Sequence, residues 1–335
     1  MLNRLKKKKS PKEIKKVDPI RYLIEFPGLW RMNENQRHDM TVACRDTDYI
    51  KKVKGSGKVL AKDGIKVQLM HNGLMMKLGG YHGEWMAKII SDLKGHHEPQ
   101  EEKVFYEVLR RLGSNSTMIE LGAFWAYYSI WFNYYLKKAT NICCEPDPNN
   151  LAIGKLNAQI NKVNNIHFIE GAAGKTDGEM TDVVMDSSPK NTVRVPIRTA
   201  SSLAKEYGMI KVDLLHMDVQ GFELGALEGA QDLISSKKLR FIFVSTHHYF
   251  FSGKANTHQE CLHFIKKNGG HIISSHTVAE SFSGDGLIVA SFDDRDKNFK
   301  VETSINHTDQ SLFRSYEEDV ALLADLYRRN SKEES

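Results

Sequence analysis

Short apolar runs alternate with helical patterns along most of the chain after residue 100. Continuous apolar runs of about four to eight residues predict buried strands, and apolar residues at every third or fourth position predict amphipathic helices. The runs predict strands at residues 117–123, 141–144, 166–169, 213–219, 241–245, 271–274 and 286–292. Helices are predicted at residues 101–112, 151–162, 223–235 and 258–268. A further helix is predicted to follow the first strand and to end at residue 138. This alternation is typical of a doubly wound parallel sheet.

Two segments interrupt the regular alternation. The last two strands are joined through a turn-rich link at residues 280–285 that is too short for a helical crossover, so we expect these strands to pair antiparallel. Between the third and fourth strands, residues 183–208 break the pattern and predict an extra strand at 193–197 and a helix at 201–207. The predicted core is therefore an α/β seven-stranded sheet whose last strand is antiparallel.

The flanks of this core carry weaker patterns. In residues 17–100, one alternating run at 65–70 is followed by turn sequences, which predicts a small strand-and-turn lead-in without a core of its own. Near the other end, spaced apolar residues from Leu312 to Tyr327 predict a helix. The predicted organisation is a basic disordered tail (1–16), an N-terminal α+β appendage (17–100), the sheet domain (101–300) and a C-terminal helix and tail (301–335).

Charge is concentrated at the N-terminal end. The chain of 335 residues has a net charge of +5, but residues 1–16 alone carry eight basic residues and one acidic residue. The rest of the chain is therefore slightly negative, which argues against a basic nucleic-acid surface on the folded body. Two interpretations of the tail stay open: a solvated segment without a partner, or an anchor for anionic lipid or nucleic acid.

Other compositional features narrow the class of protein. No stretch of about 18 apolar residues is present and the lysine-rich start has no apolar segment behind it, so we expect a cytosolic protein without a transmembrane segment or secretory signal. The four cysteines, at positions 44, 143, 144 and 261, form no C-x-x-C pair. They predict reduced, mostly buried thiols rather than a zinc knuckle or a disulfide framework.

A glycine turn follows the first predicted strand. The strand ends at Glu120, and Gly122 and Ala123 lead directly into a helix, so a ligand can approach the backbone closely there. The second strand ends at Glu145, where a carboxylate can accept hydrogen bonds from both hydroxyls of a ribose. These positions predict a site for a nucleoside-containing cofactor. In a structural alternative, Gly122 only permits close packing and Glu145 only caps a helix.

The turn also distinguishes between cofactors. A dinucleotide needs the spacing G-x-G-x-x-G, whereas this turn has Gly122 alone, followed by Trp125 and Ala126. An acidic residue at Glu120 would repel a pyrophosphate. It suits S-adenosylmethionine, which has no phosphate and carries a sulfonium and an ammonium group. We therefore expect S-adenosylmethionine rather than a nicotinamide cofactor.

The sheet region resembles the FkbM family of S-adenosylmethionine-dependent methyltransferases. The matching stretches are residues 118–123, 145–148 with Asn157 and Asn161 in the helix that follows, 218–224 and 227–230. Residues 44–46 and 95–102 resemble a long-form branch of the family. Ala126 departs from the motif, which usually has a glycine there. The resemblance implies a class I Rossmann-like methyltransferase fold and methyl transfer to a hydroxyl of a sugar, a glycan or a secondary metabolite.

The same resemblance implies roles for cofactor-binding residues. Glu120 is expected to contact the methionine amine, the backbone at Gly122 and Ala123 to face the cofactor, and Glu145 to bind the ribose. By analogy, the adenine edge is expected near Glu170 and Ala172, after the third strand. His96, His97 and Glu98 are expected to form a loop and a helix start near the cofactor.

Candidate catalytic residues follow other strand ends. The active crevice of an open α/β sheet lies beyond the carboxyl ends of its strands, where Asp218, His247 and His248 are predicted, and Asp285 can reach the same rim. Histidine is the natural base near pH 7, and adjacent strand residues face opposite ways, so one of the two histidines is expected to face the crevice. Asp218 could instead accept backbone hydrogen bonds. By ligand type alone, Asp218, one histidine and Asp285 could also hold a divalent metal.

Three rival functions are weighed against a methyltransferase. A nicotinamide-dependent oxidoreductase is disfavoured by the missing glycines and by the lack of a suitably placed Tyr-x-x-x-Lys pair. A non-catalytic S-adenosylmethionine-binding module predicts binding without turnover. A nucleic-acid methyltransferase is disfavoured because the fourth strand ends in Asp-Val-Gln-Gly rather than in the Asn/Asp-Pro-Pro-aromatic type of base-flipping motif.

Overall fold

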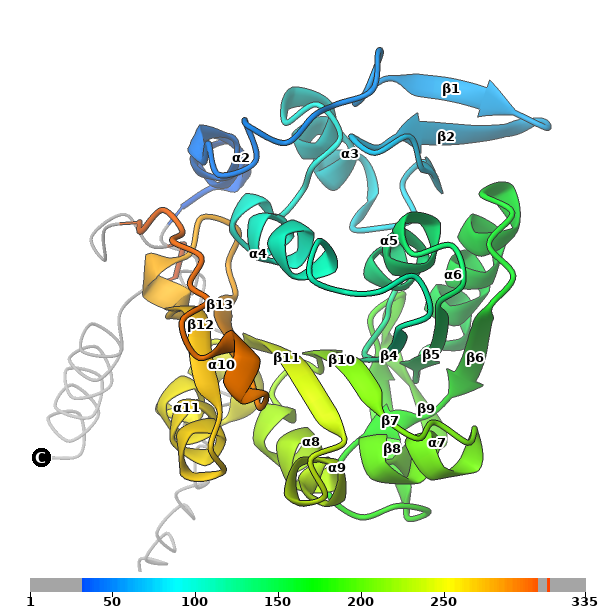
Figure 1. Ribbon diagram of the computed structural model, residues 1–335. Helices are drawn as coiled ribbons and strands as arrows, with labels where there is room; N and C mark the ends of the chain where they lie inside the picture. Colours follow the sequence, from blue (N-terminus) through cyan, green and yellow to red (C-terminus); the bar gives the residue numbers. More distant parts are fainter. Residues whose placement is uncertain (1–31, 307–311, 314–335) are drawn as a thin grey trace, which may run out of the picture.

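A seven-stranded mixed sheet forms the centre of the molecule (Figure 1). The computed structural model describes residues 32–306 and 312–313. The strand order is β12-β13-β11-β10-β4-β5-β6, with β13 antiparallel to both of its neighbours and the pairs from β11 to β6 parallel. The predicted seven-stranded α/β sheet, with its antiparallel last strand, is confirmed. The strands are β4 (Thr117–Leu121), β5 (Thr140–Glu145), β6 (Ile166–Glu170), β10 (Val212–Asp218), β11 (Leu239–Thr246), β12 (His271–His276) and β13 (Gly286–Ser291).

Helices cover both faces of this sheet, as Figure 1 shows. Successive strand residues point to opposite faces, so Met118 of β4 joins one hydrophobic core, whereas Ile119 and Leu121 join the other. The first core also contains residues of α4 (Pro99–Leu109), α5 (Tyr127–Tyr135) and α6 (Pro148–Ile160). The second contains residues of α7 (Ala200–Glu206), α8 (Glu223–Gly229), α9 (Gln231–Ser235) and α11 (Thr257–Lys267). The single helix predicted at 223–235 is thus divided at Ala230 into α8 and α9.

The N-terminal appendage is a small sheet with two helices. Its elements are α2 (Glu34–Ala43), β1 (Val59–Lys62), β2 (Ile65–Leu69), β3 (Met75–Lys77) and α3 (Gly83–Asp92), and the three strands pair antiparallel. Its buried residues Met76 and Ile89 belong to the same hydrophobic core as α4 and α5. Most of the appendage therefore packs on the seven-stranded sheet, whereas Met40 of α2 belongs to a third, small cluster with Leu312 and Phe313.

Two asparagines of α6 fasten β3 to the main domain. Asn157 Oδ1 accepts a hydrogen bond from the backbone N–H of Lys77 at 2.7 Å. Asn161 accepts from the N–H of Met75 and donates to its carbonyl, both at 2.8 Å. These amides make the bonds that a neighbouring strand would make with β3.

An additional hairpin stands beside the third strand of the main sheet. It consists of β8 (Met180–Met185) and β9 (Ser188–Arg198), and β7 (Ala172–Ala173) pairs with β9. The predicted strand at 193–197 is the second half of β9, whereas β8 was not predicted because its residues are exposed or only half-buried. At the hairpin tip, the N–H of Ser187 donates to Asp147 at 2.9 Å, so the tip lies beside the start of α6.

Three further predictions concern burial and the ends of the chain. All four cysteines are free and buried, as expected. Across residues 32–306, no helix combines the length and the apolar character needed to cross a membrane. The basic tail at 1–16 and most of the helix predicted from Leu312 to Tyr327 lie outside the described residues.

Candidate active site

The turn after β4 is built around Gly122. Its φ of 75° lies in the left-handed region, and a Cβ added there would lie 1.7 Å from the carbonyl oxygen of Asp218 at the end of β10. The N–H groups of Gly122 and Ala123 both donate to the carbonyl of Cys144, at 2.9 and 3.2 Å. Only glycine fits this turn. Ala126, where the family motif usually has glycine, has a φ of 61° and therefore adopts the left-handed conformation at a cost of about 1–2 kcal/mol.

Glu145 ends β5 with its side chain buried beside this turn. One carboxylate oxygen accepts from the N–H of Phe124 at 2.8 Å and the other from the N–H of Asp147 at 2.9 Å. Burial raises the pKa of Glu145 to about 8. Each carboxylate oxygen has two lone pairs, so one on each remains for a ribose diol. On the neighbouring strand β6, Glu170 pairs with Glu145 and is exposed. Ala172, two residues later, is buried in β7.

Glu120 lies under the first turn of α5. One of its oxygens accepts from the N–H of Ser129 at 3.1 Å, and the other lies 3.9 Å from Nδ1 of His216. Burial raises the pKa of Glu120 to about 7. This carboxylate therefore retains lone pairs at the bottom of the cavity that opens on the glycine turn.

Residues of the appendage cover the same cavity. Tyr81, from the turn between β3 and α3, stacks on Trp125 with 5.1 Å between ring centroids and donates from its hydroxyl to Glu98 at 2.9 Å. The cavity lining includes the carboxylates of Glu98, Glu120 and Asp218 and no lysine or arginine among the described residues. Such a lining fits the sulfonium and ammonium of S-adenosylmethionine, whereas a pyrophosphate would find no counter-charge there.

The two adjacent histidines after β11 lie in different surroundings. His247 is 4% exposed, with Nδ1 2.6 Å from Glu223 and Nε2 3.2 Å from Asp218 and 3.5 Å from Asp285. The ring of His248 instead stacks on Phe313, at 4.5 Å between centroids. His248 also begins α10 (Tyr249–Ser252), where its Nδ1 accepts from a backbone N–H. Only His247 of the pair therefore meets the candidate catalytic carboxylates.

The carboxylates around His247 set its charge. Burial opposes protonation of His247, but Asp285, Asp218 and Glu223 together raise its pKa well above the usual value. Burial also disfavours ionised Asp218, yet the hydrogen bond from His247 lowers its pKa. Burial raises the pKa of Asp285 to about 7, although His247 opposes the shift. These carboxylates therefore favour the cationic form of His247, whose Nδ1 donates to Glu223 and whose Nε2 lies beside Asp218 and Asp285, and Asp285 is the carboxyl group that titrates near neutral pH.

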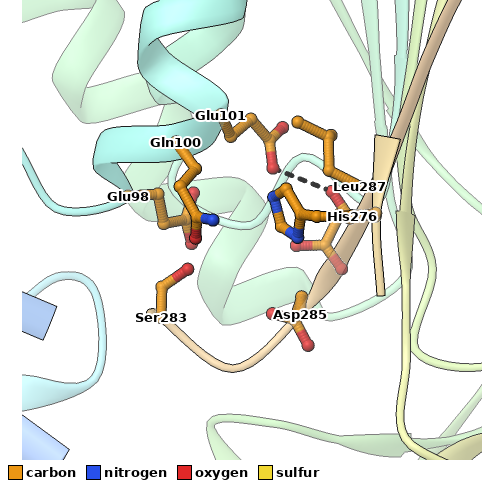
Figure 2. A pocket seen from close by; sticks show the side chains of 9 residues that line it. Glu98, Gln100, Glu101, His276, Ser283, Asp285 and Leu287 are labelled. Atoms are coloured by element: carbon orange, nitrogen blue, oxygen red, sulfur yellow. Dashed lines mark hydrogen bonds between the residues drawn. The ribbon is translucent and has the colours of Figure 1, made fainter. Parts of the chain in front are cut away.

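A second cavity lies at the ends of the last strands (Figure 2). In it, one carboxylate oxygen of Glu101 is hydrogen-bonded to Nε2 of His216 at 2.7 Å. The other oxygen accepts a hydrogen bond from the hydroxyl of Ser245 at 3.0 Å. The two cavities share Glu98 and Asp218 in their linings. The second cavity is lined by Glu98, Gln100, Glu101, Asp218, Ser245, His276, Ser283, Asp285 and Leu287.

Sequence reasoning did not select Glu101 or His276 for the site. His276 ends β12, so the strand-end rule that selected His247 could have found it. Glu101 lies in the first turn of α4, and only the packing of this helix over the sheet brings it to the cavity. No signal in the sequence indicates that placement.

One buried group in the described residues has the composition of a metal site. His71, His96 and Glu102 offer ligand atoms that all lie within 4.8 Å of one another. The two rings stack at 3.9 Å between centroids with 17° between their planes, and Nδ1 of His96 lies 2.5 Å from Glu102. The lone pairs lie in the ring planes, and two nearly parallel planes do not bring them to one point between the rings. This group differs from the set that ligand type alone made possible from the sequence, namely Asp218, one histidine and Asp285.

A family model matches the central part of the sequence. Residues 103–272, about half of the chain, match a family described as the methyltransferase FkbM domain. A search of curated proteins found no match.

A search of solved structures found matches of low identity and low TM-score. Precorrin-6y C5,15-methyltransferase from Geobacter metallireducens is 13% identical over 56% of this chain and 87% of its own, with a TM-score of 0.37. Magnesium protoporphyrin IX methyltransferase from Synechocystis is 12% identical over 57% and 76%, with a TM-score of 0.38. TrmK from M. capricolum is 10% identical over 68% and 84%, with a TM-score of 0.36.

Proposed function

The chain belongs to the FkbM family of methyltransferases, and on this premise we propose that it transfers the methyl group of S-adenosylmethionine to a hydroxyl of a small molecule or a glycan. The observation that carries the proposal is the shared wall of the two cavities. Glu98 and Asp218 line both the cavity at the glycine turn and the cavity beside His247 and Asp285. A cofactor in the first cavity and an acceptor in the second would therefore be neighbours.

The cofactor is proposed to lie along the ends of β4, β5 and β6. Glu145 would bind the ribose, Glu120 with the backbone of Gly122 and Ala123 would face the methionine part, and Glu170 and Ala172 would lie near the adenine. When bound, S-adenosylmethionine supplies a methyl carbon whose bond to sulfur breaks with the electron pair leaving on sulfur. Holding the acceptor oxygen in line with that carbon can be worth an effective molarity of about 10⁵ M or more.

The acceptor hydroxyl must lose its proton while its oxygen bonds to the methyl carbon. We propose that the carboxylate of Asp285 is the general base that accepts this proton, because its pKa of about 7 lets it accept a proton near neutral pH. His247 positions Asp285 and Asp218 through ion pairs with both carboxylates, and Glu223 in turn positions the imidazole of His247. A positioned general base contributes roughly 10²–10⁴-fold to the rate.

Calorimetric titration with S-adenosylmethionine, S-adenosylhomocysteine and NAD tests the cofactor assignment. We expect the two adenosyl ligands to bind and Glu145→Ala to weaken their binding about 10- to 100-fold, which corresponds to losing two hydrogen bonds to the ribose. Glu179→Ala, which removes an exposed carboxylate, is the matched control. Binding of NAD in place of the adenosyl ligands would overturn the assignment in favour of an oxidoreductase.

Release of S-adenosylhomocysteine in the presence of hydroxylated acceptors tests the reaction. Cofactor binding without turnover on any acceptor would favour the non-catalytic module instead. The cytosolic location and the partner of the basic tail remain predictions from the sequence.

A further inference from the structure

The cavity in Figure 2 is lined almost entirely by hydrogen-bond acceptors. Gln100 has no free donor, because its Nε2 donates to the carbonyls of Glu280 and Ser304 at 3.2 and 2.7 Å. The hydroxyl of Ser245 donates to Glu101. Ser283 is the lining residue whose hydroxyl can still donate into the cavity. A ligand in this cavity must therefore supply the donors itself.

His276 adds a further acceptor. Its side chain is 3% exposed, and its Nδ1 lies 3.3 Å from the carbonyl oxygen of Thr277. A carbonyl only accepts, so Nδ1 carries the hydrogen, and burial lowers the pKa of His276 and keeps the ring neutral. Its Nε2 is then a bare lone pair, and it has no hydrogen-bond partner in the described structure. Figure 2 shows the ring between Glu101 and Asp285.

Acidic side chains are the most frequent members of the same lining. Glu98, Glu101, Asp218 and Asp285 contribute four carboxyl groups, and no lysine or arginine lines the cavity among the described residues. The cationic partners are imidazoles: His216 contacts Glu101, and His247 contacts Asp218 and Asp285. An anionic ligand would be repelled here, and a cationic one would be favoured over a neutral one of the same shape.

We infer that the acceptor carries a protonated primary amine close to the hydroxyl that is methylated, and that Glu98, Glu101 and Nε2 of His276 receive its three N–H groups. Amino sugars and other hydroxylated amines have this chemistry. Asp285, which Figure 2 shows on the opposite side of His276 from Glu101, is left free to accept the hydroxyl proton. The inference rests on the proposed function, since it assigns the acceptor of that reaction.

The subsite lies mostly outside the range that the family model matches. Of the residues that line the cavity, only Asp218 and Ser245 fall within the matched range 103–272. The glycine turn and Glu145 fall inside that range. Selection of the acceptor is thus assigned to segments on either side of the cofactor-binding core.

Matched pairs of probes test the inference. Glucosamine and galactosamine are compared with their N-acetyl forms, with glucose and galactose, and with glucosamine 6-phosphate. Binding to the complex with S-adenosylhomocysteine is measured by calorimetry, and turnover by release of S-adenosylhomocysteine and by locating the new methyl group. We expect the free amines to bind at least tenfold more tightly than their uncharged counterparts and the phosphate to weaken binding.

Two variants distinguish whether the subsite binds the ammonium of the acceptor or the ammonium of S-adenosylmethionine. Glu101→Gln keeps the shape of the side chain and removes its charge, and His276→Asn removes Nε2; both residues line only the second cavity. We expect each to remove most of the preference for the amine and to change the affinity for S-adenosylmethionine less than twofold. Equal loss of S-adenosylmethionine affinity would show that the cofactor's own ammonium lies there and would overturn the inference.

The remaining outcomes separate the inference from the proposed function. Amines that bind selectively without being methylated would support the subsite while the proposed reaction fails. Neutral or acetylated sugars that bind as tightly as the amines would overturn the subsite whether or not they are methylated. A methyl group found on nitrogen would also overturn it, because the amine would then be the nucleophile.

Discussion

Nδ1 of His247 lies 2.6 Å from a carboxylate oxygen of Glu223, and both side chains are buried. Glu223 is the first residue of α8, and the same oxygen accepts from the N–H of Gly221 at 2.8 Å. The pair fixes the imidazole ring so that Nε2 points to Asp218 and Asp285. Glu223 is therefore a positioning residue that acts through His247.

Replacing Glu223 by glutamine removes the charge and keeps the shape. We expect the pKa of His247 to fall and, because its cation then stabilises ionised Asp285 less, the pKa of Asp285 to rise. The acid limb of the pH dependence of kcat should move to higher pH, and kcat at pH 7 should fall about tenfold or more. Glu228→Gln, on the exposed side of the same helix, is the control. An unmoved acid limb would contradict the positioning role.

Asp285→Asn tests the proposed base directly. The ionised fraction of Asp285 rises as the pH passes through about 7, so the wild-type kcat should increase from pH 6 to pH 8 and then level off. The variant should lose roughly 10²–10⁴-fold in kcat and lose this dependence, with S-adenosylmethionine binding retained. Asp294→Asn, whose side chain is 95% exposed, should match the wild type. A retained acid limb in Asp285→Asn would assign the base elsewhere.

Gly122→Ala tests the glycine turn. An added Cβ would overlap the carbonyl of Asp218, so the turn must open and the ends of β4 and β10 must separate. We expect a lower Tm and at least tenfold weaker binding of S-adenosylmethionine. Gly64 has a comparable φ of 79° but open space around its Cα, so Gly64→Ala should cost only about 1–2 kcal/mol of stability and leave binding intact. Similar behaviour of the two variants would show that close approach to Asp218 is unimportant.

Asn161→Ala tests the attachment of the appendage. The change leaves the N–H and carbonyl of Met75 without their partners, which should lower the free energy of unfolding by about 1–3 kcal/mol. Urea denaturation followed by tryptophan fluorescence measures the effect. Asn191→Ala removes an exposed hydrogen bond within the β8–β9 hairpin and should change stability by less than about 0.5 kcal/mol. Equal stability of both variants would leave Asn161 without a structural role.

The order of the main strands was predictable because each is an almost continuous apolar run. Strands β10 and β11 are buried along nearly their whole length, which produces that pattern. Helix α2 was not predicted because its sequence is mostly polar, and only three of its residues are buried. The division at Ala230 has no signal in the apolar pattern, and neither does the close packing beside it, where a Cβ at Gly229 would lie 2.2 Å from the carbonyl of Gly174.

The candidate site was predictable where a residue follows directly from a strand end. Gly122, Glu145 and Asp218 were found in this way. The choice between His247 and His248 required the structure, because it depends on Glu223 lying opposite one ring and Phe313 opposite the other. The charge of His247 was likewise set by carboxylates that come from three different segments.

Strand β3 lies at the border of the small sheet, where an uncovered strand can pair with another protein molecule and begin aggregation. Asn157 and Asn161 occupy its outward N–H and carbonyl groups, so this border offers little to a strand from a second chain. The two amides thus protect a three-stranded sheet from growing by strand addition. An enzyme that lacked them would risk intermolecular association each time the appendage loosened from α6.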